Sequence, residues 1–409
     1  MGRVLYVGID LAETEPHRAA ILDDDKILSE RRVEPNARGL ASLLAEIAKY
    51  ESENSRVLVA VERPDGLFVG ELLQRGYTVY PINPKAMERY RDRFKLAGTK
   101  TDSLDARCLA SLLRTDRDAY RPLRPDSDRT RELRMLTRDL ADLTKTRTML
   151  VLQLRAALLS AFPAAVEVFS DLSAPSALSF LRAFPSLQQA QAATDDQIAA
   201  ALKAGGYPRP EIKVAELRAI LHKPQLMVDA AVASAKRILI VTLVETLLPL
   251  GQQIKAYDKR VDALFKDHPD REVFLSLPGA GPRLAARLAA ELGDHCERFP
   301  SAREVAAFSG MAPVTRQSGK TRTVVFRRAC CKPFREVMHQ FGFCSLSRAP
   351  WARIYYDVKR AEGKRHAEAL RCLGMKWLRI IHAMWTNHTP YDPTRISTAA
   401  QASPARKAG

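Results

Sequence analysis

The segment from Val4 to Asp10, near the start of the chain, is almost wholly apolar and ends on a carboxylate. One face of a strand over these residues would be wholly apolar, and the other would end on the carboxylate of Asp10. The pattern therefore predicts a buried strand that carries Asp10 to its end. Because a buried aspartate without a partner is costly, we expect other polar groups beside Asp10.

The same patterning continues as alternating strands and helices. We expect strands over His17–Leu22, Lys26–Val33, Arg56–Glu62 and Tyr77–Ile82, and helices over Leu40–Tyr50, over Leu67–Arg75 and from Pro84. A basic segment, Arg89–Lys100, precedes another helix, for which Thr101 or Asp102 is a suitable N-cap. These elements predict an α/β layer of roughly 120 residues.

Leucines at three- and four-residue spacing then predict two long helices. The first runs through Leu133–Leu154 for about 30 residues, or roughly 45 Å, and the second through Leu243–Leu264, with a kink expected at Pro249. We expect these coiled-coil-like helices to pair, within one chain or between chains. Short amphipathic helices fill the insert between them, 162–224, to which no chemistry can be assigned.

A glycine-containing turn, Leu277–Gly281, leads directly into an Ala-rich helix. Gly279 and Gly281 allow close backbone approach, and a helix N-terminus suits a phosphate. The segment resembles the turn of helix-hairpin-helix DNA-binding modules, although a plain helix-start loop explains it equally well. The predicted division is an α/β domain at 1–125, coiled-coil helices with their insert at 126–268, a mostly helical domain at 269–395 and a disordered tail at 396–409.

The charge is strongly basic and uneven. The formal net charge is +17, and residues 301–409 hold 20 Lys and Arg against 6 Asp and Glu. This asymmetry predicts a polyanionic partner, most often nucleic acid, held by the C-terminal part, although a merely soluble basic surface is the alternative. Six cysteines without a CxxC pair favour a reducing cytoplasm. The start has no signal-peptide pattern, and the most apolar run, Ile238–Leu250, is too short to span a bilayer, so no membrane role is expected.

The candidate partners of Asp10 are three further acids. Glu62 ends another predicted strand, and Asp102 and Asp105 share a helix face at i, i+3 spacing. Four clustered acids would repel one another unless cations lay between them, and Mg²⁺ or Mn²⁺ prefers such oxygen ligands. Paired ions of this kind assist phosphodiester cleavage. The alternative is that Asp102 only caps its helix and Asp105 is only a solvated charge.

Two blocks of sequence resemble the DEDD transposases of the IS-one-ten insertion-sequence family. The first comprises VGIDLAETEPHRAAIL, VLVAVERPDG and VYPINPKAMERYRDRFKLAGTKTDSLDARCLA, and the second is LPGAGPRLAARLAAELGDHCERFPSAREVAAFSGMAPVTRQSGK. Both blocks occur in order with the predicted long helices between them, so the resemblance covers nearly the whole chain.

The resemblance implies an N-terminal RNase H-like fold of the RuvC type, with Asp10, Glu62, Asp102 and Asp105 as its metal-binding tetrad. It also implies a bacterial recombinase that a structured bridge RNA guides to donor and target DNA. The protein would act as a homo-oligomer, a dimer or tetramer, in which the acidic site of one subunit meets the C-terminal domain of another. The family nucleophile is a serine that becomes joined to a DNA phosphate, and Ser318 stands at the matching position.

The residues around Ser318 are compatible with that role. A serine hydroxyl needs activation, and no Ser-His-Asp motif surrounds it, so metal ions held by the tetrad would have to assist. Gly319 leaves room for DNA, and neighbouring cations can neutralise phosphate: Lys320, Arg322, Arg327 and Arg328. A surface turn is the plain alternative, and Ser309, also followed by glycine, is the second candidate nucleophile. Many relatives have a glycine-asparagine pair where this chain has Cys330-Cys331, so roles just after the Ser-Gly pair do not transfer.

Other functions fit parts of the pattern. A RuvC-like, structure-selective nuclease would use the acids for hydrolysis and form no covalent adduct. A sugar kinase or actin-like ATPase would need further glycine-rich phosphate loops, which the sequence lacks. A non-catalytic nucleic-acid-binding protein would carry the acids incidentally.

Overall fold

The computed structural model describes residues 4–12, 15–64, 66–92, 102–224, 228–319 and 321–394. The chain forms two compact units, Met1–Asp126 and Ser127–Gly409. The division of the chain into four parts stays a prediction, and the tail expected over 396–409 lies outside the described residues.

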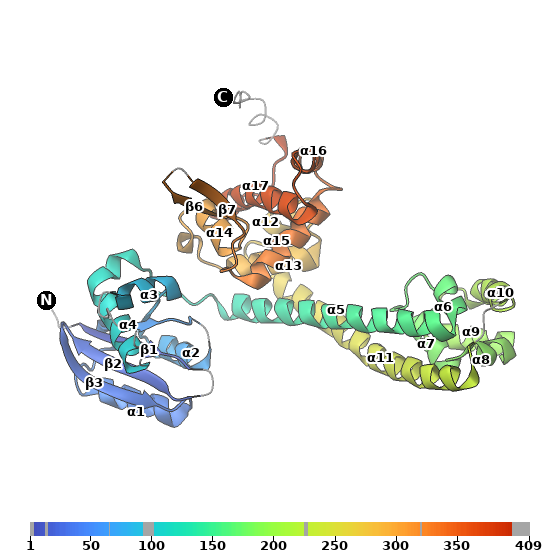
Figure 1. Cartoon of the computed structure of the whole chain (residues 1–409), viewed down its shortest axis with the longest axis horizontal. Helices are drawn as coiled ribbons and strands as arrows, with labels where there is room; N and C mark the ends of the chain where they lie inside the picture. Colours follow the sequence, from blue (N-terminus) through green and yellow to red (C-terminus); the bar gives the residue numbers. More distant parts are fainter. Residues whose placement is uncertain are drawn as a thin grey trace. The chain divides into compact units, whose positions relative to one another are not determined.

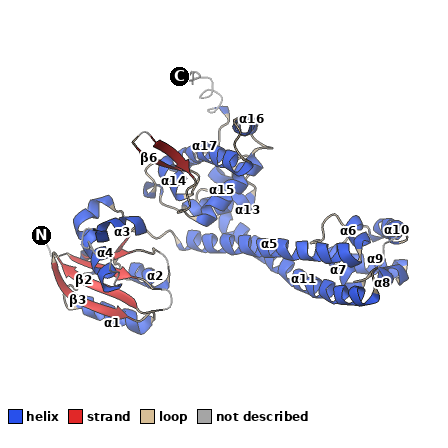
Figure 2. Ribbon diagram, viewed as in Figure 1, coloured by secondary structure: helices blue, strands red, loops and turns tan. Residues whose placement is uncertain are grey.

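The first unit contains one five-stranded sheet of mixed direction (Figure 2). Its strands are β1 (Leu5–Asp10), β2 (His17–Asp23), β3 (Lys26–Val33), β4 (Val57–Val61) and β5 (Thr78–Pro81). The spatial order is β3-β2-β1-β4-β5, with β1–β2 and β2–β3 antiparallel and β1–β4 and β4–β5 parallel. The sequence pattern therefore predicted every strand of this sheet to within a residue or two.

Helices cover both faces of the sheet. They are α1 (Ala37–Ala48), α2 (Leu67–Gln74), α3 (Pro84–Asp92) and α4 (Asp102–Asp116), with short 3-10 turns η1 (Asn54–Arg56) and η2 (Arg117–Ala119). α1 and α2 contribute to one buried cluster with the sheet, and α3 and α4 contribute to others. Helix α1 begins three residues before the predicted Leu40, because Asn36 caps it by accepting a bond from the Gly39 amide (3.0 Å). The mixed α/β class is confirmed, and the RNase H-like identity stays a prediction.

The second unit is mainly helical and is organised along two long helices, α5 (Asp128–Ala161) and α11 (Ala230–Lys266) (Figure 1). The two pack along each other within the chain, and α11 continues as a helix through Pro249. Pairing within one chain, one of the two arrangements expected from the leucine spacing, is therefore present. Coiled-coil geometry stays a prediction.

Two separate cores lie along this pair. The first joins the end of α5 and the start of α11 to the short helices of the insert: α6 (Pro163–Val168), α7 (Pro175–Ala183), α8 (Leu187–Ala192), α9 (Asp195–Ala204) and α10 (Pro210–Leu221). The second joins the opposite ends to the C-terminal helices: α12 (Arg271–Leu275), α13 (Pro282–Leu292), α14 (Ala302–Phe308), α15 (Lys332–Ser345), α16 (Pro350–Ala361) and α17 (His366–Thr386), together with the turn η3 (Cys296–Arg298).

The C-terminal part also contains a two-stranded antiparallel hairpin, β6 (Val314–Ser318) and β7 (Thr321–Val325) (Figure 2). The sequence indicated a turn at the Ser-Gly pair but not the two strands that flank it. β-branched residues on both sides of the Ser-Gly pair were the available signal, but the strands are exposed, so no apolar alternation marked them. Over the part of the chain that is described, no helix is long and apolar enough to cross a membrane.

Candidate functional sites

The register of the central strands places Asp10 and Glu62 at one edge of the sheet. β1 and β4 are parallel neighbours, with Ile9 opposite Val61. Asp10 is the last residue of β1, and Glu62 directly follows β4. Because parallel strands end at the same edge, the two carboxylates leave the sheet side by side.

A glycine in the middle of β1 brings the third acid to this edge. A Cβ atom on Gly8 would lie 1.9 Å from the Ala106 carbonyl oxygen and 2.6 Å from the Ala110 amide nitrogen. Helix α4 therefore lies directly on the backbone of β1, and Asp105 is carried to the end of the strand. We assigned Gly8 no role from the sequence, although a glycine inside an apolar strand often marks such close approach.

Three of the four predicted acids line one pocket of about 330 Å³, namely Asp10, Glu62 and Asp105. Asp102 is the first residue of α4, but its side chain lies outside the described residues. The rest of the lining comes from α3: Pro84, Lys85, Glu88 and Arg91. Sequence reasoning missed these α3 residues, because a charged helix face without a motif is typical of a solvated surface.

Arg91 neutralises the most buried of these acids. Its Nε atom lies 2.8 Å from Asp105 Oδ1, and Asp105 is only 6% exposed. An arginine in this place compensates a carboxylate that burial would otherwise penalise. Among the described side chains, no group of three or more His, Cys, Asp and Glu residues is arranged to hold a metal ion. The chemistry of the pocket nevertheless fits a hard divalent cation, because carboxylate oxygens are the ligands that such ions prefer.

Ser318 occupies the end of β6, at the tip of the exposed hairpin. It pairs with Thr321 across the turn, and Gly319 adopts a left-handed conformation there (φ 54°). Ser318 is exposed, whereas Ser309 is fully buried and its hydroxyl donates to the Ala306 carbonyl oxygen (3.3 Å). Of the two candidate nucleophiles, only Ser318 is accessible to a large substrate.

The predicted cations around the hairpin differ in what they do. Arg322, on β7, lies opposite Gln317 of β6. Both Arg322 and Arg328 are exposed. Arg327 is half-buried, and its Nε atom donates to the Ala312 carbonyl oxygen (3.1 Å) at the base of the hairpin. Arg327 therefore also stabilises the hairpin. Lys320 lies outside the described residues.

The two glycines of the α12–α13 turn also differ. Gly279 has a positive φ of 85°, and a Cβ atom there would lie 2.7 Å from the Cys344 carbonyl oxygen in α15. Packing within the protein thus accounts for Gly279. A Cβ atom on Gly281, the N-cap of α13, would meet no atom within 4 Å. Gly281 is the glycine that leaves the helix start open to a ligand.

Comparison with known proteins gives the same order of parts. A profile of DEDD transposases of the IS110 (IS-one-ten) type, described as "Transposase", matches residues 7–163. A second profile, "Transposase IS116/IS110/IS902 family", matches residues 271–357. The first covers the acidic pocket and the second covers the α12–α13 turn and the hairpin.

Curated relatives match the chain over nearly its full length. The mini-circle putative transposase for IS117 of Streptomyces coelicolor is 33% identical over 398 residues, which is 96% of each chain. An uncharacterized 42 kDa protein of insertion element IS900 from Mycobacterium paratuberculosis is 27% identical and covers 98% of this chain and 100% of its own length. An uncharacterized 44.8 kDa protein of IS116 from Streptomyces clavuligerus is 28% identical over 95% of this chain and 96% of its own length.

These matches define the chain as a transposase of an insertion sequence, an enzyme that acts on DNA. It belongs to the IS110 family. The family resemblance found in the sequence is thereby confirmed.

Proposed function

We propose that this transposase cleaves and rejoins DNA strands through a covalent intermediate on Ser318, assisted by a divalent cation at the acidic pocket and directed by a structured guide RNA. The observation that carries the proposal is the convergence of Asp10, Glu62 and Asp105 on one pocket. Acids that gather at the ends of adjacent strands need a cationic partner, and phosphodiester chemistry uses such partners.

In the proposed reaction, Ser318 Oγ attacks the phosphorus of a DNA phosphodiester. Ser318 Oγ loses its proton and forms a bond to phosphorus, and the bond from phosphorus to one bridging oxygen breaks. The departing oxygen takes up a proton and becomes the free hydroxyl of the released strand end. Attack by a hydroxyl of another strand reverses the exchange and releases Ser318. One phosphodiester replaces another at each step, so no nucleotide cofactor is required.

The chain's own residues would prepare this exchange. Asp10, Glu62 and Asp105, with Asp102 as the fourth acid, would hold Mg²⁺ or Mn²⁺. When bound, the cation supplies charge that polarises the phosphate and stabilises the leaving oxygen. Arg91 would give up its contact with Asp105 and become available to a phosphate. Arg322 and Arg328, together with Lys320, would neutralise the DNA backbone beside Ser318.

The partners follow from the same proposal. The protein would bind donor DNA, target DNA and a bridge RNA, and would act as a dimer or tetramer in the bacterial cytoplasm. The uneven basic charge supports a polyanionic partner, and sequence choice would rest with the RNA because backbone contacts carry no sequence information.

Trapping the intermediate tests this proposal. Protein loaded with its RNA, mixed with DNA and Mg²⁺, should yield a protein–DNA adduct that resists denaturation, and Ser318→Ala should abolish it. Ser347→Ala, which changes another exposed serine of the same unit, should leave the adduct intact.

Two results would contradict it. Cleavage without an adduct would favour the second candidate function, a RuvC-like nuclease that works by metal-dependent hydrolysis. The same acidic pocket is compatible with that function. Absence of cleavage with any RNA and divalent ion would favour a binding protein without catalysis.

A further inference from the structure

The second unit contains a larger cavity, of about 760 Å³, that the proposed chemistry does not use. It lies where the start of α13 faces α5 and α15. Its lining is rich in cations, which include Lys145, Arg283, Arg287 and Arg335, and Glu336 is its acid. Such a cavity is suited to an anion that is held by several groups at once.

The N-terminus of α13 opens into this cavity. The helix is 11 residues long, its N-cap Gly281 and first residue Pro282 both line the cavity, and no side chain caps its first turn. The positive end of the helix dipole therefore faces the space. Because Gly281 has no neighbour within 4 Å of a Cβ position, a ligand can approach the backbone there.

Arg287 points to an anionic ligand independently of the helix start. The residue is 8% exposed and lines the cavity, yet its Nε atom is buried without a hydrogen-bond partner within the described parts of the chain. Its Nη2 atom donates only through long contacts, to the Pro333 carbonyl oxygen (3.3 Å) and to Glu336 Oε2 (3.5 Å). A buried guanidinium normally has better partners than these.

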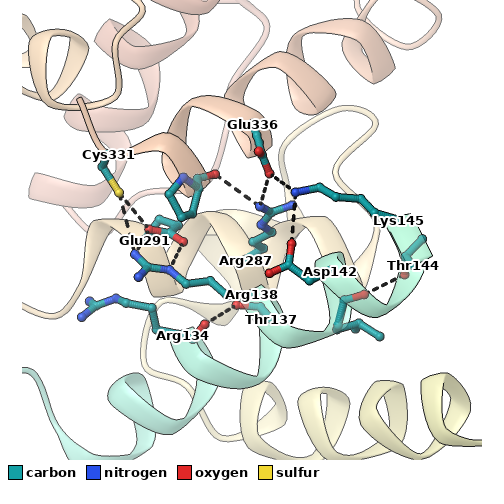
Figure 3. A network of polar contacts seen from close by, with 12 residues as sticks. Arg134, Thr137, Arg138, Asp142, Thr144, Lys145, Arg287, Glu291, Cys331 and Glu336 are labelled. Carbon is teal, nitrogen blue, oxygen red and sulfur yellow. Dashed lines mark hydrogen bonds and ion pairs between the residues drawn. The ribbon is translucent and has the colours of Figure 1, made fainter. Parts of the chain in front are cut away.

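Glu336 acts as the counter-ion of the cavity. Its Oε2 atom lies 2.9 Å from Lys145 Nζ and is shared with Arg287, while Lys145 also contacts Asp142 at 3.1 Å (Figure 3). The Glu336 side chain is 45% exposed, so rotation into solvent releases both cations at small cost. Arg283 is held by Asp258 outside the cavity and is less available.

Neighbouring contacts fix this arrangement in place. Arg138 of α5 forms two bonds to the buried Glu291 of α13, at 2.8 and 2.7 Å (Figure 3). In addition, Arg134 Nε donates to the Ala290 carbonyl oxygen at 2.7 Å. Helix α13 is therefore tied firmly to α5. The cavity is a built feature of the fold, and Glu336 is its displaceable part.

We propose that this cavity binds a phosphate group of a nucleic-acid strand, held by the start of α13, Arg287 and Lys145 after Glu336 has moved aside. The volume also accommodates the adjoining sugar. That the strand is a nucleic acid rests on the proposed function, whereas the site itself is separate from Ser318 and from the acidic pocket.

Binding of labelled single-stranded DNA and RNA, measured by fluorescence anisotropy as a function of salt, tests the proposal. Arg287→Gln should weaken binding about tenfold, as expected for a charge-assisted bond, and should reduce the slope of log K against log salt by about 0.7. Lys145→Gln should act in the same direction. Glu336→Gln should strengthen binding, because it removes the competing carboxylate.

Arg260→Gln is the matched control, since it removes an ion-paired arginine of α11 that does not line the cavity. Unlike Arg287→Gln, this variant should keep the wild-type affinity and the wild-type slope of log K against log salt. Equal losses in the two variants, or weaker binding in Glu336→Gln, would overturn the proposal. If Arg287→Gln does not fold, the other two variants test the proposal: Lys145→Gln should weaken binding and Glu336→Gln should strengthen it.

A loss of affinity in Arg287→Gln for DNA alone or for RNA alone would identify the nucleic acid that the cavity binds. Either result would support the proposed site. The test also separates this proposal from the serine mechanism. Arg287→Gln should still form the covalent adduct at saturating DNA, and Ser318→Ala should bind nucleic acid with unchanged affinity.

Discussion

The acidic pocket and the serine hairpin position their proposed reactive groups in different ways. Asp10 and Glu62 are placed by parallel strand ends, and Asp105 by a helix that touches the sheet backbone at Gly8. Ser318 projects from an exposed two-stranded hairpin, whose strands have almost no buried residue. The first site is fixed by packing within its own unit, whereas the residues of the second are largely exposed.

Substitutions at the two sites should therefore have different effects. A substitution near the acids can reduce activity by destabilising the fold, by removing a charge or by both. A change on the hairpin should affect nucleic acid and leave folding almost untouched.

The largest expected effect comes from removing one acid of the pocket. Asp10→Asn should lower the rate of strand cleavage about 1,000-fold, because metal assistance contributes several kcal/mol. The rate should be measured in single turnover with saturating Mg²⁺. Glu53→Gln, an exposed acid of the same unit, should keep the wild-type rate. Undiminished cleavage by Asp10→Asn would exclude the metal-site interpretation.

The next effect separates packing from charge. Gly8→Ala should destabilise the first unit by about 1–3 kcal/mol, because its methyl group would push α4 away from β1. Chemical denaturation followed by circular dichroism measures this loss. Gly70→Ala is the control, since it lies in α2 with no atom within 4 Å of a Cβ position. That variant should be stabilised by about 0.5–1 kcal/mol, and equal behaviour of the two variants would refute the packing argument.

On the hairpin we expect the reverse. Arg322→Gln should change the free energy of unfolding by less than about 0.5 kcal/mol, since the side chain is exposed. It should reduce the salt dependence of duplex DNA binding by about 0.9 in log–log slope. Arg182→Gln, on α7, serves as the control and should leave the slope unchanged. A large loss of stability in Arg322→Gln would show that the hairpin is part of the packed fold.

The smallest effect should be that of mild acid on stability. Burial lowers the pKa of His268 in the second unit and the pKa of His17 in the first below the usual 6.5. The unfolded chain therefore binds protons that the folded chain does not, so stability falls as the pH drops below about 6.5. Thermal melts between about pH 7.5 and 5.5 should show this loss, and His268→Gln should reduce it. A melting temperature that rises on acidification would contradict the assignment of neutral buried histidines.

Sequence patterns revealed the acidic pocket better than the hairpin for a physical reason. Buried strands must alternate or be apolar, so the strands that end at Asp10 and Glu62 were readable. The role of Gly8 was not readable in the same way, because the sequence does not show that the backbone of Ala106 packs against it. Arg91 belongs to a charged helix face whose contact with Asp105 is long-range.

The hairpin strands escaped prediction because exposed strands have no apolar face to reveal them. The resemblance to a family, which rested on ordered motifs, nevertheless directed attention to Ser318. The cavity at α13 shows the same limit, since Gly281 was noticed in the sequence but Arg287 and Glu336 were not.

The attachment of DNA to Ser318 is the central claim, and mass spectrometry of the proteolysed adduct tests it most directly. We expect a peptide that contains Ser318 and carries a nucleotide remnant through a phosphate on Oγ. A remnant on any other residue, or cleaved DNA without a modified peptide, would contradict it.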